Sequence, residues 1–405
     1  MADMKPIKPA GDGAPRRKPV RVSLVVFPEC DPSIIYGVFD TLWAAGRLWE
    51  AAMGVKEELL FEPRLVAAEK GPLPLMTGVT IVPQDSIADV AETDVVFVPN
   101  VMIDSAAALR GLDRRLLDWI RRMYAAGAQI YSACGGSLVL AEAGLLDGRE
   151  TTTHWVYVPL FREEFPNVAL HQDRILVQTG PGHSIVCGGG ASSWQDLSLL
   201  LIAKHGGNDE AIRISKFFLY QWHREGQLPY ASMAANVDHG DAAILACQSW
   251  LADNYEQPDI VSELARRSGL PKRTFDRRFK AATGYAPLAY VQALRIEEAK
   301  QLLETTATRI DAIAREVGYE DLASFRRLFR RLSGMTPGDY RRKFQMPSFV
   351  KRAVGKEDQK PMQRAAGGPG RNSARLRRDH ESMSGTKVAD GRKALRTEGG
   401  RARRR

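Results

Sequence analysis

Short runs of apolar and β-branched residues recur along the first half of the chain. The first run, VRVSLVVF at residues 20–27, ends at Pro28 and has the pattern of a strand buried in a parallel sheet. Further strands are predicted at residues 64–68, 79–82, 94–99, 129–132, 175–178 and 184–187. Helical patterns lie between them, for example at residues 109–126 and 192–205. Strands that alternate with helices predict an α/β sheet with right-handed crossovers.

The pattern changes after residue 220. A polar segment at residues 221–240 holds Gly226, Pro229 and Gly240, and we predict an interdomain linker there. Beyond it, the apolar positions follow helical spacing. Helices are predicted at residues 242–255, 260–267, 272–282, 287–304, 310–316, 321–332 and 337–344. We therefore expect an α/β domain at residues 20–220 and an all-α domain at residues 241–345.

An internal repeat organises the helical part. With one extra residue allowed after Tyr319, nine pairs of residues are identical between the two copies. The pairs are Ala265/Ala314, Arg266/Arg315, Gly269/Gly318, Phe275/Phe325, Arg277/Arg327, Phe279/Phe329, Gly284/Gly334, Pro287/Pro337 and Tyr290/Tyr340. Each copy has a short helix, a glycine at the turn and a second helix with two phenylalanines four residues apart. This arrangement predicts two helix-turn-helix units, whose second helices enter the major groove of DNA.

The second helix of each unit carries polar residues, most of them basic, on the face opposite its phenylalanines. They are Lys272, Arg273, Asp276, Arg277 and Lys280 in the first unit, and Ser324, Arg326, Arg327, Arg330 and Arg331 in the second. Arginine can bond guanine in a bidentate fork or hold a phosphate, and lysine mainly supplies charge to phosphates. The alternative is the solvated face of an ordinary helical bundle, which accounts less well for a basic face that occurs twice. Joined by the helix at residues 287–304, the two helices are expected to reach successive major grooves about 34 Å apart.

Residues 241–345 resemble the DNA-binding domain of the AraC/XylS transcription regulators. The resemblance rests on Ile310-x-x-Ile-Ala-x-x-x-Gly-Tyr, on Phe325-x-x-x-Phe329 and on Gly334-Met-Thr-Pro-x-x-Tyr-Arg. It implies operator DNA and RNA polymerase as partners. By the same resemblance, the base-reading residues are Arg273, Asp276 and Arg277 in the first recognition helix, and Ser324, Arg326 and Arg327 in the second. The acidic residue at position 276 would suit the N4 donor of cytosine.

The charge of the chain is unevenly distributed. Its 405 residues are 44% hydrophobic and 26% charged, which excludes a collagen-like or multi-span membrane protein. Residues 1–240 hold 22 basic against 28 acidic side chains, residues 241–345 hold 18 against 14, and residues 346–405 hold 17 against 6. The C-terminal basicity points to a polyanionic partner. Residues 1–19 and 346–405 are predicted to be a disordered leader and a disordered basic tail, because they lack the apolar residues of a core.

Four cysteines lie far apart along the chain, without the paired spacing of a disulfide or zinc framework. No apolar stretch approaches the length of a transmembrane helix. We therefore expect a cytoplasmic protein with no metal, no cofactor and no membrane partner.

The segment QIYSACGGS at residues 129–137 places Cys134 in a glycine-flanked turn between a strand and the helix predicted at residues 138–143. Such a turn has the geometry of a nucleophile elbow, and a helix N-terminus favours the thiolate. His154, in the stretch Thr-Thr-Thr-His-Trp, offers an imidazole that could pair with the thiol. The alternative is a small buried cysteine and a hydrogen-bonded histidine without a chemical role. The run Cys187-Gly-Gly-Gly190 lacks the Lys-Ser/Thr ending of a phosphate loop, so we interpret it as a tight strand-to-helix turn.

Residues 20–219 resemble the DJ-1/PfpI class of the glutamine-amidotransferase-like superfamily, whose members carry a cysteine at this elbow. The stretch AEAGLLDG from residue 141, followed by TTHW, resembles the branch fused to AraC-type domains, the GlxA-type regulators. The resemblance implies a flavodoxin-like, DJ-1-like sheet and, in the enzymes of the class, a carboxylate beside the cysteine. When the chain is aligned on Gly37, Ile34 stands at the position of that carboxylate, and Glu29 and Asp31 are out of register.

Without that carboxylate we expect no enzyme. We interpret the α/β domain as a sensor that binds a small effector, with Cys134 and His154 as candidate contacts. The resemblance implies a nitrogenous metabolite as the effector and activation of bacterial catabolic or stress genes. A homodimer is expected, because doubling increases the specificity of a domain that reads short base sets. The alternatives are a cysteine-dependent amidase or hydratase with a DNA-binding domain, and a nonspecific nucleic-acid binder driven by the basic tail.

Overall fold

A computed structural model describes residues 18–233, 236–237, 239–347 and 350. The described residues divide into two compact units. One runs to residue 231 and includes residues 333–335, and the other holds the rest from residue 232 onward. The disordered segments predicted at residues 1–19 and 346–405 lie almost wholly outside the described residues.

The first unit is built on a seven-stranded sheet with the strand order β10-β11-β7-β6-β1-β2-β5. These strands are β1 (Val20–Val25), β2 (Phe61–Ala67), β5 (Asp85–Ser86), β6 (Val95–Val98), β7 (Gln129–Ala133), β10 (Leu176–Thr179) and β11 (Ile185–Gly188). Neighbouring strands run parallel, except that the edge strand β10 is antiparallel to β11. The predicted α/β class is confirmed, and one antiparallel edge strand is common in such sheets.

Two short strand pairs lie outside the main sheet. They are β3 (Leu73–Pro74) with β4 (Thr80–Ile81), and β8 (Glu150–Thr151) with β9 (Ala169–Leu170). The strand predicted at residues 79–82 is therefore not part of the main sheet. Val79 and Val82 are exposed, because β4 pairs only with β3 in a hairpin.

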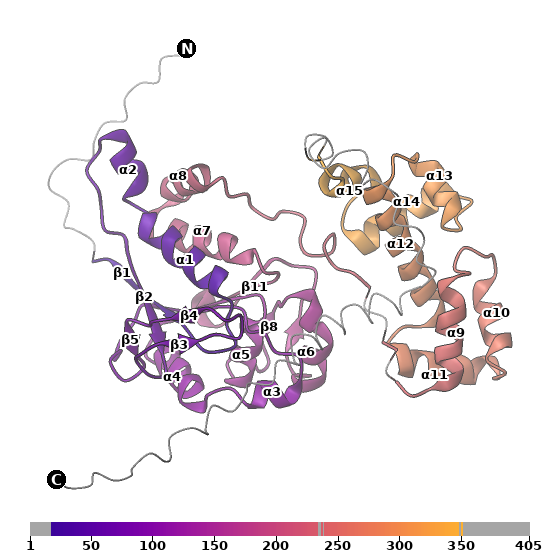
Figure 1. The fold of residues 1–405 in the computed structure, drawn as a ribbon, viewed down its shortest axis with the longest axis horizontal. Coiled ribbons are helices and arrows are strands. Elements are labelled where there is room, and N and C mark those ends of the chain that lie inside the picture. Colours follow the sequence, from indigo (N-terminus) through magenta and orange to yellow (C-terminus); the bar gives the residue numbers. More distant parts are fainter. Residues whose placement is uncertain (1–17, 234–235, 238, 348–349, 351–405) are drawn as a thin grey trace, which may run out of the picture. The chain divides into compact units, whose positions relative to one another are not determined.

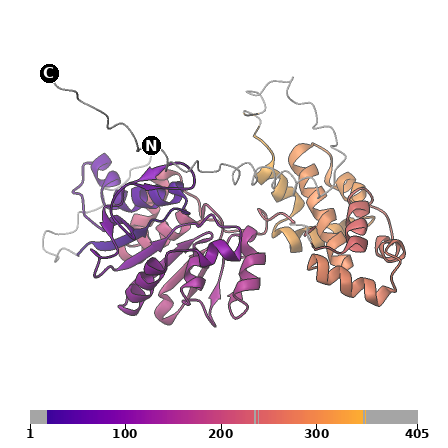
Figure 2. The ribbon, with the colours of Figure 1, turned by 60° about the horizontal axis from the view of Figure 1, so that its bottom comes forward.

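Helices cover both faces of the sheet (Figures 1 and 2). On one face α1 (Pro32–Ala44) packs against α7 (Ser193–Gly206), and on the other α5 (Gly136–Glu142) packs against α4 (Arg114–Ala125). The remaining helices are α2 (Leu48–Met53), α3 (Ala106–Arg110), α6 (Val158–Glu164) and α8 (Asn208–Phe218), with short turns η1 (Trp155–Tyr157) and η2 (Pro181–His183). The sheet is thus enclosed between two helical layers.

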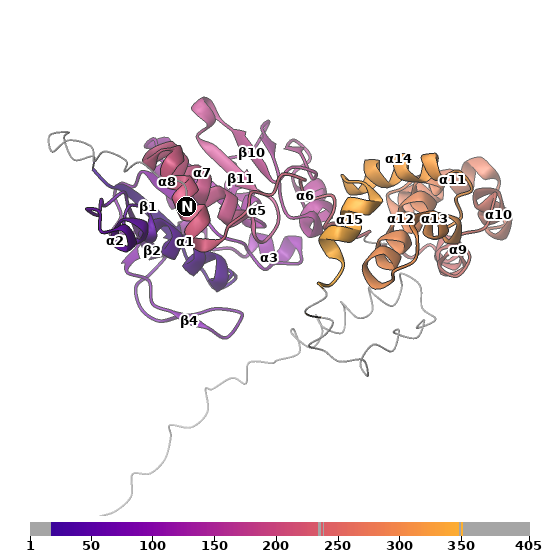
Figure 3. The same ribbon diagram turned by 90° about the horizontal axis from the view of Figure 1, so that it is seen from above.

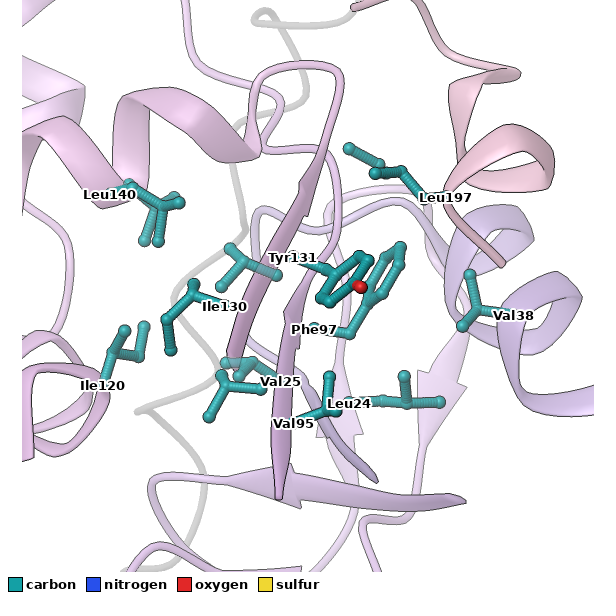
Figure 4. Close-up of a cluster of buried hydrophobic side chains, with 14 of the residues drawn as sticks. Leu24, Val25, Val38, Val95, Phe97, Ile120, Ile130, Tyr131, Leu140 and Leu197 are labelled. Atoms are coloured by element: carbon teal, nitrogen blue, oxygen red, sulfur yellow. The ribbon is translucent and has the colours of Figure 1, made fainter. Parts of the chain in front are cut away.

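The strand residues alternate between these two layers. Figure 4 shows Ile130 on the side of Ile120 and Leu140, whereas the next residue, Tyr131, lies on the side of Val38 and Leu197. All six of these residues have at most 1% of their surface exposed. Because successive side chains of a strand point to opposite faces, continuous apolar runs are what a sheet covered on both faces requires.

One predicted helix is wrong. The helix expected at residues 109–126 is two helices, since α3 ends at Arg110 and α4 begins at Arg114. Asp113 caps α4 and accepts a hydrogen bond from the Arg115 backbone N–H at 2.9 Å. The aspartate satisfies an amide at the start of a new helix, and the apolar periodicity continues across the break.

The second unit is helical. Its helices are α9 (Ala242–Ala252), α10 (Ile260–Arg267), α11 (Lys272–Thr283), α12 (Pro287–Thr305), α13 (Ile310–Glu316), α14 (Leu322–Ser333) and α15 (Pro337–Phe344). Each of the helices predicted for this part is confirmed, with bounds that differ by at most three residues. The long helix α12 runs from the group α9–α11 to the group α13–α15 (Figures 1 and 3).

Each helical group has its own core against α12. Phe275 and Phe279 of α11 pack with Leu264 and Tyr290 in the first group. In the second group, Phe325 and Phe329 of α14 are both fully buried, and the ring of Phe329 lies 5.5 Å from that of Tyr340. No helix in the described part of the chain is both long enough and apolar enough to cross a membrane.

Candidate functional site

The first candidate recognition helix, α11, follows a turn at Gly269, whose φ of 66° is in the left-handed region. Its two phenylalanines face the core, so the opposite face of the helix is turned to solvent. Lys272, Arg273, Arg277 and Lys280 are exposed on that face.

The acidic residue of the same helix behaves differently. Asp276 is only half-exposed, and one of its carboxylate oxygens accepts from Lys272 Nζ at 2.8 Å. Its other oxygen, Oδ1, is buried and makes no hydrogen bond within the described residues. Lys272 therefore holds one oxygen of this carboxylate, and the other oxygen is shielded from solvent.

The second candidate recognition helix, α14, follows a turn at Gly318 with a φ of 85°. Its arginines at positions 326, 327, 330 and 331 are exposed. Ser324 is half-buried and its hydroxyl accepts a hydrogen bond from the Arg327 guanidinium at 2.8 Å. Asp321 caps the helix, because its carboxylate accepts from the Ala323 and Ser324 amides at 3.0 and 2.9 Å. The basic surface therefore occurs on both helices, as predicted from the repeat.

Two further arginines make hydrogen bonds within the helical unit that were not predicted from the sequence. Arg278 of α11 turns away from the exposed face and forms a bidentate pair with Asp241, the N-cap of α9, at 2.7 and 2.8 Å. Arg295 of α12 donates to three backbone carbonyls, those of Tyr255, Gln257 and Gly318, at 2.7 to 2.9 Å. The only signal in the sequence was a charged residue within the apolar pattern of α12.

In the α/β unit, the elbow at Cys134 forms as predicted between β7 and α5. Cys134 has a φ of 57°, a left-handed conformation that a non-glycine residue rarely adopts. Its backbone N–H donates to the Gly188 carbonyl at 2.7 Å, and its own carbonyl accepts from the Thr153 hydroxyl at 3.2 Å. Strained backbone of this kind clusters at functional sites.

The surroundings of Cys134 favour the protonated thiol over the thiolate. Cys134 is 3% exposed, and burial raises the pKa of its thiol to about 12. The Gly135 amide lowers that pKa, but the nearby charge of Asp31 raises it further. Desolvation disfavours the charged form more than the short helix α5 favours it. Burial therefore acts against the thiolate that a nucleophilic cysteine requires.

The backbone N–H that follows the cysteine is also occupied. Gly135 donates this N–H to Asn100 Oδ1 at 3.0 Å, whereas in a nucleophile elbow the corresponding amide binds the oxyanion. A Cβ atom on Gly135 would lie 2.6 Å from the Tyr157 ring, so the surroundings are tightly filled. Tyr157 is itself held by a hydrogen bond from its hydroxyl to the Val101 carbonyl at 2.6 Å.

His154 does not pair with the thiol. Its Nδ1 accepts from the Val156 backbone N–H at 3.1 Å, which caps η1, and no hydrogen bond between His154 and Cys134 occurs among the described residues. Burial lowers the pKa of this histidine. Ile34 is buried, and Asp31 is the N-cap of α1, where it accepts from the Ser33 amide at 3.0 Å. The proposed role of Cys134 and His154 in binding an effector remains a prediction.

At least two cavities lie in the described part of the α/β unit. One, of about 500 Å³, is lined by residues 173–176, by Asp196 and by residues 222–226. The other, of about 450 Å³, is lined by Lys18, Val20, residues 59–60, Lys204 and His205. Neither is lined by Cys134 or His154.

The comparisons with known proteins agree with this architecture. The family described as "Helix-turn-helix domain" matches residues 264–343, and the "DJ-1/PfpI family" matches residues 51–168. The chain is 32% identical over 225 residues to "HTH-type transcriptional regulator GlxA" of Rhizobium meliloti, which covers 55% of this chain and 68% of the relative. It is 27% identical over 283 residues to "HTH-type transcriptional regulator CdhR" of Pseudomonas aeruginosa. This match covers 70% of this chain and 82% of the relative. The chain is also 29% identical to "Isonitrile hydratase" of Pseudomonas putida. That match covers 47% of this chain and 75% of the relative.

A DJ-1-like α/β unit followed by two helix-turn-helix units defines a class of DNA-binding transcription regulators. The chain belongs to the family of HTH-type transcriptional regulators in which an AraC-type DNA-binding domain follows a DJ-1/PfpI domain.

Proposed function

We propose that this regulator binds a specific operator through α11 and α14, which enter successive major grooves, and that a small metabolite bound by the α/β unit controls it. The observation that carries the proposal is the exposed basic face that recurs on both helices, each fixed by a buried phenylalanine pair. A single basic helix would be compatible with nonspecific attraction to phosphates. Two basic helices at equivalent places in a repeat are suited to reading two base clusters.

The basic residues divide into two proposed roles. Base reading is assigned to Arg273, Asp276 and Arg277 of α11 and to Ser324, Arg326 and Arg327 of α14. Phosphate contacts are assigned to Lys272, Lys280 and Arg330. Loss of a base contact relaxes the preference at one operator position, whereas loss of a phosphate contact weakens binding to all sequences alike.

The test is a selection of bound sequences from random duplex DNA at near-physiological salt. We expect a site with two base clusters about one helical turn apart. Arg277→Ala and Arg327→Ala should each weaken binding to that site by about 1 to 3 kcal/mol and relax one position. Arg122→Ala is the matched control, because this exposed arginine lies on α4 of the α/β unit. Equal losses on selected and random DNA would contradict the base-reading assignment.

The proposed effector is a small nitrogenous metabolite that contacts the region of Cys134 and His154. The strained backbone at Cys134 supports this placement. The test is a thermal-shift screen of such metabolites, with the compounds that raise the melting temperature then tested for a change in operator affinity. Cys134→Ala and His154→Ala should abolish the shift. A shift that persists in both variants would place the effector elsewhere.

We further propose that the protein acts in the bacterial cytoplasm as a homodimer and that it activates transcription through contact with RNA polymerase. Two copies double the number of base clusters that the complex reads. Sedimentation with and without the selected operator tests the dimer. A monomer that binds a single half-site with full affinity would rule the dimer out.

A cysteine-dependent hydratase is the second candidate, favoured by the match to isonitrile hydratase. The protonated thiol and the occupied Gly135 amide disfavour it. Selective alkylation of Cys134 by iodoacetamide at neutral pH would support this candidate, because only a thiolate reacts readily.

A further inference from the structure

Three side chains of the α/β unit form a chain of hydrogen bonds that the regulator's proposed function does not use. Asp196 Oδ2 lies 2.7 Å from His223 Nδ1, and Ser192 Oγ lies 3.2 Å from His223 Nε2. The other carboxylate oxygen of Asp196 accepts from the His223 backbone N–H at 3.0 Å. The imidazole is thus held at its backbone and at its ring by one carboxylate.

The surroundings determine the proton positions. Asp196 is 2% exposed, and its carboxylate, which only accepts hydrogen bonds when ionised, faces Nδ1. The proton of the neutral imidazole therefore resides on Nδ1, and Nε2 is left to accept from the Ser192 hydroxyl. This is the order of donor, base and orienting carboxylate that activates a serine nucleophile.

The serine occupies a favourable place in the fold. It follows β11 and the run of three glycines, and it precedes α7, so it lies at the carboxyl edge of the parallel strands. Ligands of open α/β sheets bind outside this edge. Unlike the buried Cys134 after the neighbouring strand β7, Ser192 is exposed to solvent.

A cleft is lined by two of the three residues. Asp196 and His223 both line the cavity of about 500 Å³, together with Arg174, Trp222 and Arg224. This volume is in the range of small-molecule sites. A substrate in the cleft would lie against the imidazole of His223, whose Nε2 is 3.2 Å from the Ser192 hydroxyl.

We propose that Ser192, His223 and Asp196 form an acyl-transfer site that hydrolyses small carboxylic esters. Ser192 Oγ bonds to the ester carbon while its proton passes to His223 Nε2, and the carbonyl π pair moves to oxygen. Collapse breaks the bond to the alkoxy group, which leaves with the proton from Nε2 as an alcohol. Water then attacks the acyl-serine while His223 Nε2 takes its proton. Collapse breaks the bond between the acyl carbon and Ser192 Oγ, which regains a proton from Nε2, so the products are a carboxylic acid and free Ser192. Asp196 keeps the imidazole oriented throughout.

The site is open to water, where hydrogen-bond donors stabilise an oxyanion less than they do in a site that excludes water. Esters are therefore the substrate class. An alkoxide is a better leaving group than an amide nitrogen, so hydrolysis of an ester needs less oxyanion stabilisation than hydrolysis of a peptide bond. The inference goes beyond gene regulation and is independent of Cys134.

The experiment uses the full chain, p-nitrophenyl acetate as the substrate and a fluorophosphonate as the covalent probe. We expect hydrolysis above background and labelling at Ser192, located by peptide mass spectrometry. Ser192→Ala and His223→Gln should each lower the rate by at least about a hundredfold. Ser249→Ala is the matched control, because the hydroxyl of this exposed helical serine donates to the Leu245 carbonyl. It should retain the wild-type rate.

A separate measurement tests whether the Ser192 and His223 variants are folded. Ser192→Ala removes one exposed hydroxyl, so its melting temperature should equal that of the wild type, and it serves as the decisive variant if His223→Gln is unstable. Absence of hydrolysis and labelling in the wild type would overturn the proposal, as would a full rate in Ser192→Ala. Operator selection measured on the same samples is not affected by either outcome, so failure here is distinguishable from failure of DNA binding.

Discussion

Gly269 and Gly318 occupy the same place in the two copies of the repeat, and both have a positive φ, of 66° and 85°. Their surroundings differ. A Cβ atom at position 269 would meet nothing within 4 Å, whereas one at position 318 would lie 2.4 Å from the Glu256 carbonyl oxygen and 2.9 Å from the Arg295 guanidinium carbon. The first turn needs glycine only for its backbone conformation. The second needs it also because another part of the helical unit approaches the backbone closely.

The starts of the two recognition helices differ as well. Asp321 caps α14 with its side chain, whereas α11 follows Pro271 and has no side-chain cap. Identical residues in a sequence repeat therefore do not have identical roles. The second turn is fixed by long-range contacts, and the first turn is fixed mainly by its own sequence.

The largest expected difference between the two turns is the loss of stability when each glycine is replaced by alanine. Gly318→Ala should destabilise the second turn by roughly 2 to 5 kcal/mol, because left-handed strain and overpacking add. Gly269→Ala should cost about 1 to 2 kcal/mol, from the strain alone. Hydrogen–deuterium exchange of α13–α14 and of α10–α11 in the full chain measures the two local opening energies. Equal costs would remove the distinction between the turns.

Replacement of Arg295 is expected to have the next largest effect on the stability of the second turn. Arg295→Ala leaves three carbonyls without their charged donor and should lower the stability of the second turn by about 2 to 3 kcal/mol. Arg295→Lys should recover little of this, because one ammonium cannot reproduce the fork of a guanidinium. The same exchange measurement applies, with exposed Arg309→Ala as the control. Full protection of residues 318–325 in Arg295→Ala would contradict a role for this contact.

A smaller effect is expected at the helix start. Asp321→Ala should increase exchange in the first turn of α14, since two amides lose their acceptor. It also removes the carboxylate 3.9 Å from Arg327. Pro271→Ala, at the N-cap position that precedes α11, is the comparison, because that residue supplies no side-chain cap to lose. If both variants fray equally, the cap is not what distinguishes the helices.

Lowering the pH is expected to have the smallest effect on the stability of the fold. The Ser324 hydroxyl, and the amides at the start of α14, hold the pKa of Asp321 below its ordinary value, and Arg278 does the same for Asp241. A carboxyl with a lowered pKa in the folded state stabilises above the ordinary value and loses this contribution as the pH falls through the lowered one. Urea unfolding between pH 5 and pH 2.5 should therefore show falling stability, with a shallower fall in Asp321→Ala. An unchanged slope in that variant would contradict the assignment.

The sequence predicted the helical unit well because its signal is local. Apolar spacing, the turn glycines and the paired phenylalanines lie within short windows, and the repeat presents each of them twice. The break at Gly111 was missed because the apolar period continues across it. The contacts of Arg295, the hydrogen bond between Asn100 and Gly135, and the approach of His223 to Ser192 each join residues that are at least 23 positions apart. Such pairings depend on how whole elements pack, which one sequence does not specify.

The placement of the cysteines has a practical consequence for watching this protein work. All four, Cys30, Cys134, Cys187 and Cys247, are buried and free. A maleimide dye attacks exposed thiolates, so the folded wild-type chain should take up almost none. A single cysteine introduced at Arg122, or at another exposed residue, would then be the one position that carries a fluorophore. With a second cysteine introduced at an exposed residue of the helical unit, binding of operator or metabolite could be followed by energy transfer between the two dyes, without replacing any native cysteine.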